Sequence, residues 1–305
     1  MLEASLVVIG DEILGGYVTD TNSSWLADRL REHGVPLSRV HVVPDDAGAI
    51  DEALSAELAR TRPRLVFTSG GIGSTPDDLT YEAIAASLGR ELVEDPQIGE
   101  RIQAALDWTR DQGLEVSEEF AWHLGRMARI PAGSRLLWRE GGWAPGVAVD
   151  VDGGVDADGA SIVVLPGVPS EFRAIVGQVV EPRLLAGRNE VPAVVELEHD
   201  FPESALNLTF VEVQRRYPQV KLGSYPGSPM LVRLAGERAQ VEGAAALVRA
   251  ALDTLTTSDG GARLRAAWQR RRGGADRQRS DAHASADHTP EHVSADHTAE
   301  PEEDG

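Results

Sequence analysis

Carboxylates placed beside tight turns are the residues of this sequence whose types could do chemistry. They occur as the pairs Asp11-Glu12, Asp45-Asp46 and Asp77-Asp78. A carboxylate next to a phosphate would repel it unless a cation lay between them, and hard cations such as Mg²⁺ bind carboxylate and phosphate oxygens together. Asp78, with Asp77 beside it, therefore predicts a divalent-metal site for phosphate chemistry.

The last of these pairs closes a glycine-rich turn at residues 70–75, between an apolar strand pattern at 65–67 and a helical pattern at 81–88. Such a turn lets backbone N–H groups approach an anion, and the helix start adds favourable partial charge. The turn contains no lysine, which excludes a Walker A loop. It predicts a phosphate cradle; the alternative is that Asp78 or Thr80 only caps the helix.

Strands and helices alternate through the first part of the chain. Apolar strand patterns at 5–9, 35–43 and 65–67 are separated by helical patterns that begin near Asn22 and near Ile50. This order is typical of a doubly wound α/β fold with a mostly parallel sheet, in which ligands bind beyond the carboxyl ends of the strands. Each acidic pair follows one of these strands, so we expect the pairs to converge on one site. Chance placement in so acidic a chain is the alternative.

Two helical patterns, at 95–112 and 118–127, interrupt the alternation. They predict an insertion that lies over or beside the site as a lid or a dimer surface. Its aromatic residues Trp108, Phe120 and Trp122 either stack on a flat ligand ring or pack the insertion against the sheet or a partner subunit.

A proline-glycine turn, Pro166-Gly167, follows a further apolar strand pattern at 161–165 and precedes a helical pattern at 170–185. Its position at the carboxyl end of a strand allows its backbone to form the opposite wall of the pocket. A purely structural turn explains the same residues equally well.

The patterns divide the chain into three parts. Residues 1–188 form the α/β domain, and residues 189–257 carry short strand and helix patterns that predict a smaller α+β domain. Residues 258–305 contain a repeated SADHT sequence and very few apolar residues towards the end. This last part is predicted to be a disordered tail.

Composition narrows the possible functions. The chain has no cysteine, which excludes disulfides and a thiolate nucleophile, and no apolar run long enough to span a membrane. We therefore expect a soluble, cytoplasmic protein without a membrane partner. With 49 acidic and 29 basic residues and a formal net charge of -20, nucleic acid is not an expected partner. Lys221 is the only lysine, and this acidity with arginine in place of lysine predicts a halophilic, haloarchaeal source.

Six segments, in order along the chain, resemble the motifs of CinA, the competence/damage-inducible protein A. More broadly they resemble the molybdopterin-binding domain shared by MogA, MoaB, gephyrin and MoeA. The resemblance covers about residues 4–180, and residues 190–255 resemble the small KH-type domain that follows in CinA. Trp143 stands where the family usually has threonine. The segments are Gly10–Gly15, Asp20–Ser23, Asp45-Asp46, Gly70–Thr80, Ala144–Gly146 and Leu165–Glu171.

The resemblance implies roles for residues that match the motifs. Asp45 and Asp78 match aspartates that the molybdenum-cofactor branch of the family uses with Mg-ATP, so they are expected to hold the divalent metal, with Asp77 as a third ligand. Asp11 and Glu12 are the weaker candidates for positioning water. The expected phosphate and ligand contacts are Gly10, Asn22, Gly70, Gly71, Gly73, Ser74, Thr75, Thr80, Pro145, Gly146, Pro166 and Gly167.

The resemblance also implies a choice of reactions. In CinA-like proteins the domain is similar to a metal-dependent pyrophosphatase, so hydrolysis of a nucleotide pyrophosphate such as ADP-ribose or FAD is the expected activity. The alternatives are molybdopterin binding with adenylyl transfer, and a nucleotide-binding scaffold without catalysis. Mg²⁺ or a similar divalent ion is the expected cofactor, K⁺ and molybdopterin are further candidate ligands, and a homo-oligomer is the expected assembly.

Overall fold

A computed structural model describes residues 1–271 of the chain. Its contacts divide it into two compact units, one comprising Met1–Val191 and the other beginning at Pro192. The division proposed from the sequence, between 188 and 189, falls close to this point. Each unit is considered separately below.

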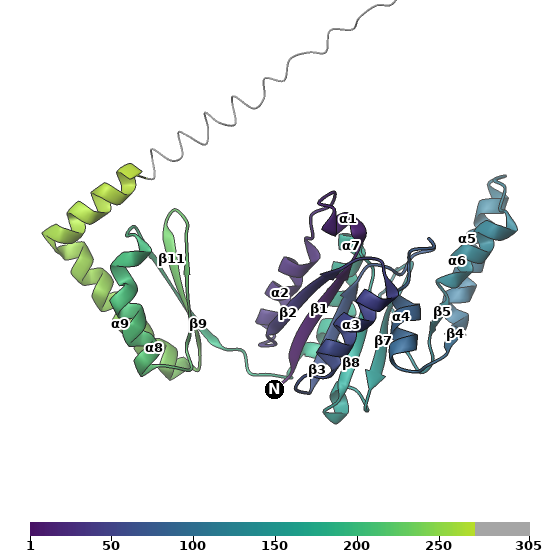
Figure 1. Ribbon diagram of the computed structural model, residues 1–305, viewed down its shortest axis with the longest axis horizontal. Coiled ribbons are helices and arrows are strands. Elements are labelled where there is room, and N and C mark those ends of the chain that lie inside the picture. Colours follow the sequence, from purple (N-terminus) through teal and green to yellow (C-terminus); the bar gives the residue numbers. More distant parts are fainter. Residues whose placement is uncertain (272–305) are drawn as a thin grey trace, which may run out of the picture. The chain divides into compact units, whose positions relative to one another are not determined.

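The first unit contains a six-stranded sheet whose first four strands in spatial order are parallel (Figure 1). The last two strands run antiparallel to their neighbours. The prediction of a doubly wound, mostly parallel α/β fold is therefore confirmed. The spatial order is β2 (Leu37–Val43), β1 (Glu3–Ile9), β3 (Arg64–Ser69), β8 (Ala160–Leu165), β7 (Gly146–Val151) and β6 (Arg135–Leu137).

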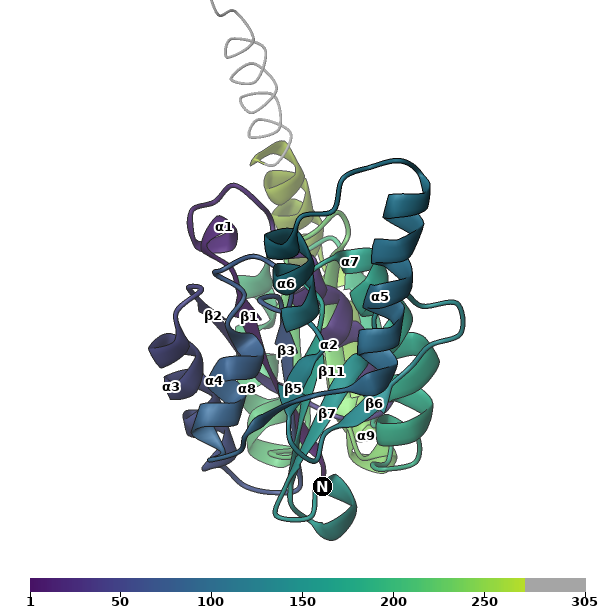
Figure 2. The same ribbon diagram turned by 90° about the vertical axis from the view of Figure 1, so that its right-hand side faces the viewer.

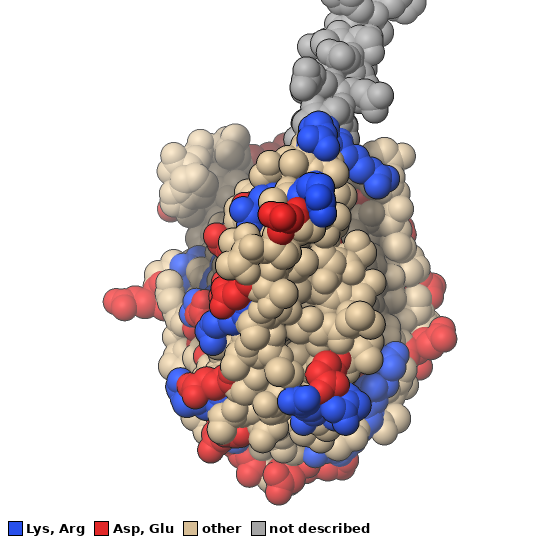
Figure 3. Space-filling view, turned by 90° about the vertical axis from the view of Figure 1, so that its left-hand side faces the viewer, with Lys and Arg blue, Asp and Glu red and all other residues tan. Residues whose placement is uncertain are grey.

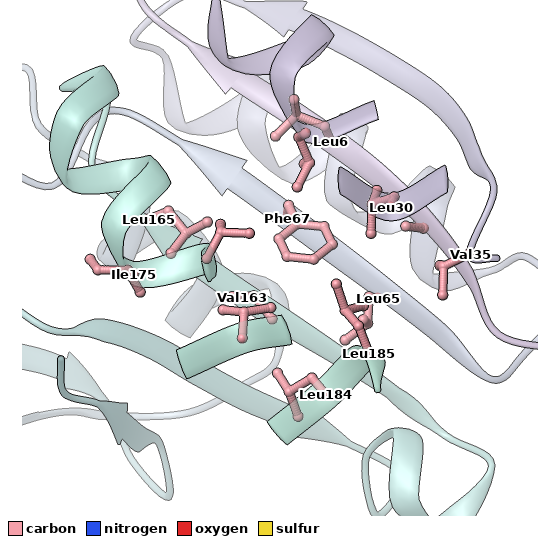
Figure 4. Close-up of a cluster of buried hydrophobic side chains, with 14 of the residues drawn as sticks. Leu6, Leu30, Val35, Leu65, Phe67, Val163, Leu165, Ile175, Leu184 and Leu185 are labelled. Atoms are coloured by element: carbon pink, nitrogen blue, oxygen red, sulfur yellow. The ribbon is translucent and has the colours of Figure 1, made fainter. Parts of the chain in front are cut away.

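Helices cover both faces of this sheet because its central strands are apolar on both sides. Alternate residues of β3 point to opposite layers: Phe67 packs in one core with residues of α2 and α7 (Figure 4), and Val66 in the other with residues of α3 and α4. The covering helices are α2 (Asn22–Glu32), α7 (Pro169–Ile175) and the π-helical η2 (Val176–Leu185) on the first face, and α3 (Ala47–Leu58) and α4 (Thr80–Ser87) on the second.

Two local predictions need correction. Asp11–Leu14 form a four-residue helix, α1, where a loop was expected; acidic residues in a first helical turn interact favourably with the free N–H groups there. The single helix expected at 170–185 is instead α7 followed by η2, which contains Pro182. Proline supplies no N–H for the regular helical pattern, so the hydrogen bonding changes register there. A short turn of helix, η1 (Val155–Ala157), precedes β8.

The predicted insertion is an arm made of α5 (Pro96–Asp111) and α6 (Glu118–Arg126) (Figures 1 and 2). The two helices lie between β4 (Leu92–Glu94) and β5 (Arg129–Pro131), which pair as a two-stranded antiparallel sheet at the base of the arm. Ile98, Ile102 and Leu106 anchor α5 in the second core, whereas α6 buries none of its residues. The arm's large aromatic residues remain exposed, by 64% for Trp108, 51% for Phe120 and 63% for Trp122. They do not pack this insertion against the sheet.

The second unit is an α+β structure with a three-stranded antiparallel sheet, in the spatial order β10-β11-β9. Its core is formed by Phe210 and Val213 of α8, Val241 and Val248 of α9, and Val232 of β11. The likeness of this unit to a KH-type domain stays a prediction. Its elements are β9 (Ala193–His199), η3 (Glu203–Leu206), α8 (Asn207–Arg216), β10 (Lys221–Tyr225), β11 (Met230–Gly236) and α9 (Arg238–Thr257).

The prediction of disorder is wrong for the start of the expected tail, because residues 259–271 are helical. Arginine and alanine are frequent there and both favour helix. The Arg265 guanidinium also lies 4.7 Å from the ring centre of Phe201, which ties this helix to the second unit. The remainder of the predicted tail, 272–305, lies outside the described residues.

Charged side chains of both signs are interleaved on the face shown in Figure 3. Within the part of the chain that the structure describes, no helix is long and apolar enough to cross a membrane. The halophilic source inferred from composition stays a prediction.

A buried ionic cluster joins α3 to the sheet of the first unit. Arg64 of β3 and Glu57 of α3 are each 1% exposed and lie 3.1 Å apart, and Glu57 also lies 2.9 Å from His41 Nε2. Burial raises the pKa of Glu57, but the hydrogen bond from His41 and the charge of Arg64 outweigh burial and hold the pKa below its usual value. Ionised Glu57 therefore stabilises the fold at neutral pH, and this contribution is lost as the pH falls below the ordinary glutamate pKa of about 4.3.

We expect Glu57→Gln to lower the free energy of unfolding by about 3 kcal/mol, because buried Arg64 then loses its one buried carboxylate partner and keeps only the partly exposed Glu3, 2.8 Å away. The double variant Glu57→Leu with Arg64→Met should recover most of that loss, since both buried charges are removed together and the remaining Glu3 carboxylate is partly exposed to solvent. Urea denaturation at pH 7 measures both, with Asp152→Asn, which removes an exposed ion pair to Arg62, as the control of little expected effect. A double variant as unstable as the sum of its single variants would contradict this account.

Candidate functional site

The candidate site lies where the order of the strands reverses, between β1 and β3. Chain segments leaving β2, β1, β3 and β8 meet there because these four strands are neighbours and parallel. They enclose an open cleft of about 540 Å³. The residues lining it are Ile9, Gly10, Glu12, Asp45, Gly70, Gly71, Ile72, Gly73, Asp77, Asp78, Met127, Ala144, Pro166, Gly167, Val168 and Glu171.

The glycine turn after β3 is held tightly against the neighbouring segments. Gly70 and Gly71 have φ angles of 106° and 64°, which favour glycine. A Cβ atom at position 70 would lie 2.3 Å from the carbonyl oxygen of Ile9, and one at position 71 would lie 2.4 Å from Thr80 Oγ1. A Cβ at Gly167 would lie 3.4 Å from Gly70 Cα, so the turn after β8 is adjacent. Only glycine fits at positions 70 and 71.

Two predicted ligand contacts, Thr80 and Asn22, serve as the frame of this turn. The Thr80 hydroxyl is buried and donates to the Gly70 carbonyl at 3.0 Å. Asn22, which is 5% exposed, donates from Nδ2 to Ser69 Oγ at 3.0 Å and to the Gly167 carbonyl at 2.9 Å. Asn22 therefore joins the segments after β3 and β8, and neither residue lines the cleft.

Asp78 closes the glycine turn on itself. Its Oδ2 atom accepts hydrogen bonds from the Thr75 backbone N–H at 2.8 Å and from the Thr75 hydroxyl at 2.6 Å. Its other carboxylate oxygen has no hydrogen bond to the described residues. Asp77 is exposed, and the nearby hydroxyl of Thr75 lowers its pKa. Both aspartates line the cleft, where their carboxylates can face a cation.

Arg126, at the end of α6, holds the same turn from the arm and was missed by the sequence analysis. Its guanidinium donates to the Thr75 carbonyl at 3.2 Å, to the Asp78 carbonyl at 3.1 Å and to Glu82 at 3.0 Å. An arginine in the last turn of a helix is ordinary, so the sequence carried no signal for this contact. The contact makes the arm part of the site.

Asp45 lies in an environment that disfavours its charge. It accepts a hydrogen bond from the Asp11 backbone N–H at 2.9 Å. Burial is the main cause that raises its pKa; the Asp11 N–H opposes this, and the nearby charges of Glu12, Asp11 and Asp77 add to the rise. Asp46, its neighbour, faces away and caps α3 through Ala49. The structure thus separates the members of this acidic pair.

The three predicted metal ligands line one cleft, but they do not form a complete cage. Within residues 1–271, no three side chains of histidine, aspartate or glutamate come close enough together to hold a metal ion. Mg²⁺ commonly takes one or two carboxylates and completes its shell with substrate phosphates and water. The donor set fits a cation of this kind that binds together with a phosphate ligand.

Other predicted contacts are placed as follows. Glu12, Gly10, Gly73, Pro166 and Gly167 line the cleft. Asp11 contributes its backbone N–H to Asp45, and Ser74 and Thr75 belong to the turn without lining the cleft.

The predicted pair Pro145 and Gly146 lies behind the cleft. Ala144 lines the cleft itself, Pro145 lines a small neighbouring cavity, and Gly146 is buried against Leu165 and Ile175. Met127, Val168 and Glu171 are lining residues that the sequence analysis did not name as contacts. A methionine, a valine and a glutamate share no chemical property, so their residue types gave no signal of a binding site in the sequence.

Comparison with known proteins gives the family. A family model described as "Probable molybdopterin binding domain" matches residues 5–186. A protein of Thermococcus kodakarensis is 36% identical over 181 residues, which are 59% of this chain and 69% of that protein. A protein of Aeropyrum pernix is 34% identical over 261 residues, 83% of this chain and 91% of that protein.

CinA-like proteins are among the relatives. One from Anaeromyxobacter sp. (strain Fw109-5) is 36% identical over 192 residues, which are 63% of this chain but only 43% of that protein. The crystal structure of CinA from Thermoplasma acidophilum, a protein described as having unknown function, is 31% identical, with a TM-score of 0.47, and the match covers 57% of this chain and 94% of that one. Since the family model matches more than half of the 305 residues, this protein belongs to the molybdopterin-binding domain family and is a relative of the CinA-like proteins.

Proposed function

We propose that the first unit binds a nucleotide pyrophosphate and hydrolyses it with the help of a divalent cation. One observation carries the proposal: a glycine turn with free backbone donors and the carboxylates of Asp45 and Asp78 line the same cleft. A cleft of about 540 Å³ is in the range that takes a nucleotide-sized ligand. Glycine amides alone would bind a phosphate, and acids alone a cation; the combination favours a phosphate and a cation together.

The glycine turn can offer several N–H groups to a phosphate. Among the described residues, the N–H groups of Gly71, Ile72, Gly73 and Ser74 have no hydrogen-bond partner. Those of Gly70 and Thr75 are already used, by the Leu165 carbonyl and by Asp78. Consecutive free amides in a turn form an anion-binding concavity. The predicted roles of Gly70 and Thr75 therefore become structural, and the cradle narrows to residues 71–74.

Asp45 and Asp78 each have one carboxylate oxygen free of hydrogen bonds to described residues, so each offers one oxygen to a cation. When bound, a divalent cation would neutralise charge that develops on the phosphoryl oxygens and lower the pKa of water. Glu12 lines the same cleft, which makes it the better of the two weaker candidates for orienting water; Asp11 contributes through its backbone N–H.

Molybdopterin binding with adenylyl transfer is the second candidate, because the matching family model is described as a molybdopterin binding domain. It predicts transfer of AMP from ATP to a pterin and little hydrolysis of ADP-ribose. A scaffold without catalysis predicts binding without turnover of either.

We expect Asp78→Asn to reduce hydrolysis of ADP-ribose or FAD at least about 100-fold, because the charge that pairs with the cation is lost. The fold should persist, since the asparagine oxygen can still accept the bonds from Thr75. Release of AMP is measured in molar KCl, with Mg²⁺, Mn²⁺ or Co²⁺ against EDTA. Asp46→Asn, at a helix cap outside the cleft, is the matched control and should keep its turnover. Equal activity of the Asp78 variant and the wild type would remove Asp78 from the mechanism.

Asp45→Asn should abolish the rise in melting temperature that a bound divalent cation gives. Ionised Asp45 is disfavoured in the folded state, so the variant should melt at the same or a higher temperature without divalent metal. Wild type should gain stability from Mg²⁺ with pyrophosphate, and the variant should not. In wild type this gain should fade as the pH falls through a midpoint above the ordinary aspartate pKa of about 3.9. Thermal melts at several pH values test this; a variant that keeps the metal-linked gain would argue against it.

Arg126→Lys should impair the site although it keeps the positive charge, because an ammonium group cannot bond two carbonyls and Glu82 in the same planar arrangement. We expect kcat to fall by roughly 10–100-fold and the Mg²⁺ concentration for half-maximal activity to rise, as the turn and Asp78 lose their position. Arg110→Gln, on the exposed side of the same arm, is the control. If both variants behave alike, Arg126 does not position the turn.

A further inference from the structure

One end of the cleft is apolar. The acids and the glycine turn form the polar end, whereas Ile72, Met127 and Ala144 form a continuous apolar wall. The same three residues line a second, small cavity behind that wall, together with Tyr81, Ile98, Ile102, Trp143 and Pro145. The wall therefore separates the cleft from a wholly apolar and aromatic interior layer.

Trp143 stands at the rim of this wall. Its side chain lines the small cavity, yet 42% of the residue is exposed. It is next in sequence to Ala144, which lines both spaces. An indole that is half in contact with an apolar layer and half open to solvent, beside a cleft, has one face available for another flat group.

The loop that carries Trp143 is braced from the arm. Arg101 of α5 donates to the Gly142 carbonyl, and its guanidinium carbon lies 4.2 Å from the ring centre of Trp138. Trp138 in turn donates from Nε1 to Gln97 at 3.0 Å. Because these contacts fix the chain just before Trp143, that residue is presented at the rim with little freedom to lose on binding.

The wall offers no charge to a ligand. Tyr81 is buried, and burial with the nearby charge of Glu82 raises its pKa, so its ring stays neutral. The small cavity holds about 20 Å³, room for a single water at most. A ring therefore cannot enter the cavity and has to lie in the cleft, against Met127 and Ala144, where the exposed side of Trp143 can stack on it.

We propose that Ile72, Met127, Ala144 and Trp143 form a ring subsite and that Trp143 is a specificity-determining residue. The subsite takes a flat, uncharged aromatic heterocycle joined through a sugar or short chain to the phosphate held by residues 71–74. The inference rests on the proposed function, because it assumes that a phosphate occupies the glycine turn. It adds a selectivity to that function: this chain binds phosphates that carry an aromatic ring more tightly than phosphates that lack one.

The exposed aromatic residues of the arm are not part of this subsite. Trp108, Phe120 and Trp122 line neither the cleft nor the small cavity. Trp122, which is 63% exposed, therefore provides a matched control for removal of a tryptophan.

The test compares AMP with ribose 5-phosphate, two ligands that differ only by the adenine ring, and uses inorganic pyrophosphate as a ringless probe of the phosphate site. Binding to the full chain is measured by calorimetry with Mg²⁺. Wild type should bind AMP more tightly than ribose 5-phosphate. Trp143→Ala should weaken AMP binding about tenfold, in line with the usual value of one base stacked on an aromatic side chain. Its affinity for ribose 5-phosphate and pyrophosphate should not change.

Trp143→Phe should restore most of the preference for AMP, and Trp122→Ala should leave all three affinities unchanged. Equal losses for AMP and ribose 5-phosphate in Trp143→Ala, or no loss for either, would overturn the ring subsite. Wild type that binds pyrophosphate but treats AMP and ribose 5-phosphate alike would refute the subsite alone. Wild type that binds no phosphate ligand, while still folded, would refute the proposed function and the subsite with it.

Discussion

The close approach of backbone at Gly70 and Gly71 is the constraint on which the site depends. Side chains at these positions would collide with the Ile9 carbonyl and with Thr80, so the segments after β1 and β3 could not meet. Asn22 then ties the segment after β3 to the one after β8. These contacts convert neighbouring strand ends into a single cleft with unused N–H groups. The absence of two Cβ atoms thus decides whether the pocket exists.

Carboxylates play opposite roles in two places of the first unit. Glu57 is almost fully buried, yet Arg64 and His41 satisfy it, and its charge stabilises the fold. Asp45 has no basic partner among the described residues, so burial, together with the charges of the nearby acids, disfavours its ionised form and raises its pKa. Burial raises the pKa of both carboxyl groups, and the difference between them is that, in the described part of the chain, only Glu57 has basic hydrogen-bonding partners. A site that repels its own charges is poised for a ligand that neutralises them.

The arm gives the site both polar and apolar contacts. Arg126 bonds the carbonyls of Thr75 and Asp78, and the next residue, Met127, lines the cleft. Arg101 of the same arm steadies the loop at Gly142. The arm, which is inserted between the strands β4 and β5, therefore helps to define the geometry of the glycine turn that follows β3.

The sequence by itself determined the sheet, its helices and the strand ends that meet, because apolar periodicity and capping residues such as Asp46 and Asp95 are local signals. It also indicated that Asp45, Asp77, Asp78 and the glycine turn lie together, since parallel strands end at one edge. Only the tertiary structure decided that Thr80 and Asn22 support the turn, that Arg126 reaches it from the arm, and that Gly146 is packed away. These roles depend on contacts between residues far apart in the chain, and no periodicity encodes such contacts. Residues 259–271 were misjudged for a related reason: they were grouped with the low-complexity repeats that follow them, and composition does not reveal a contact such as that of Arg265 with Phe201.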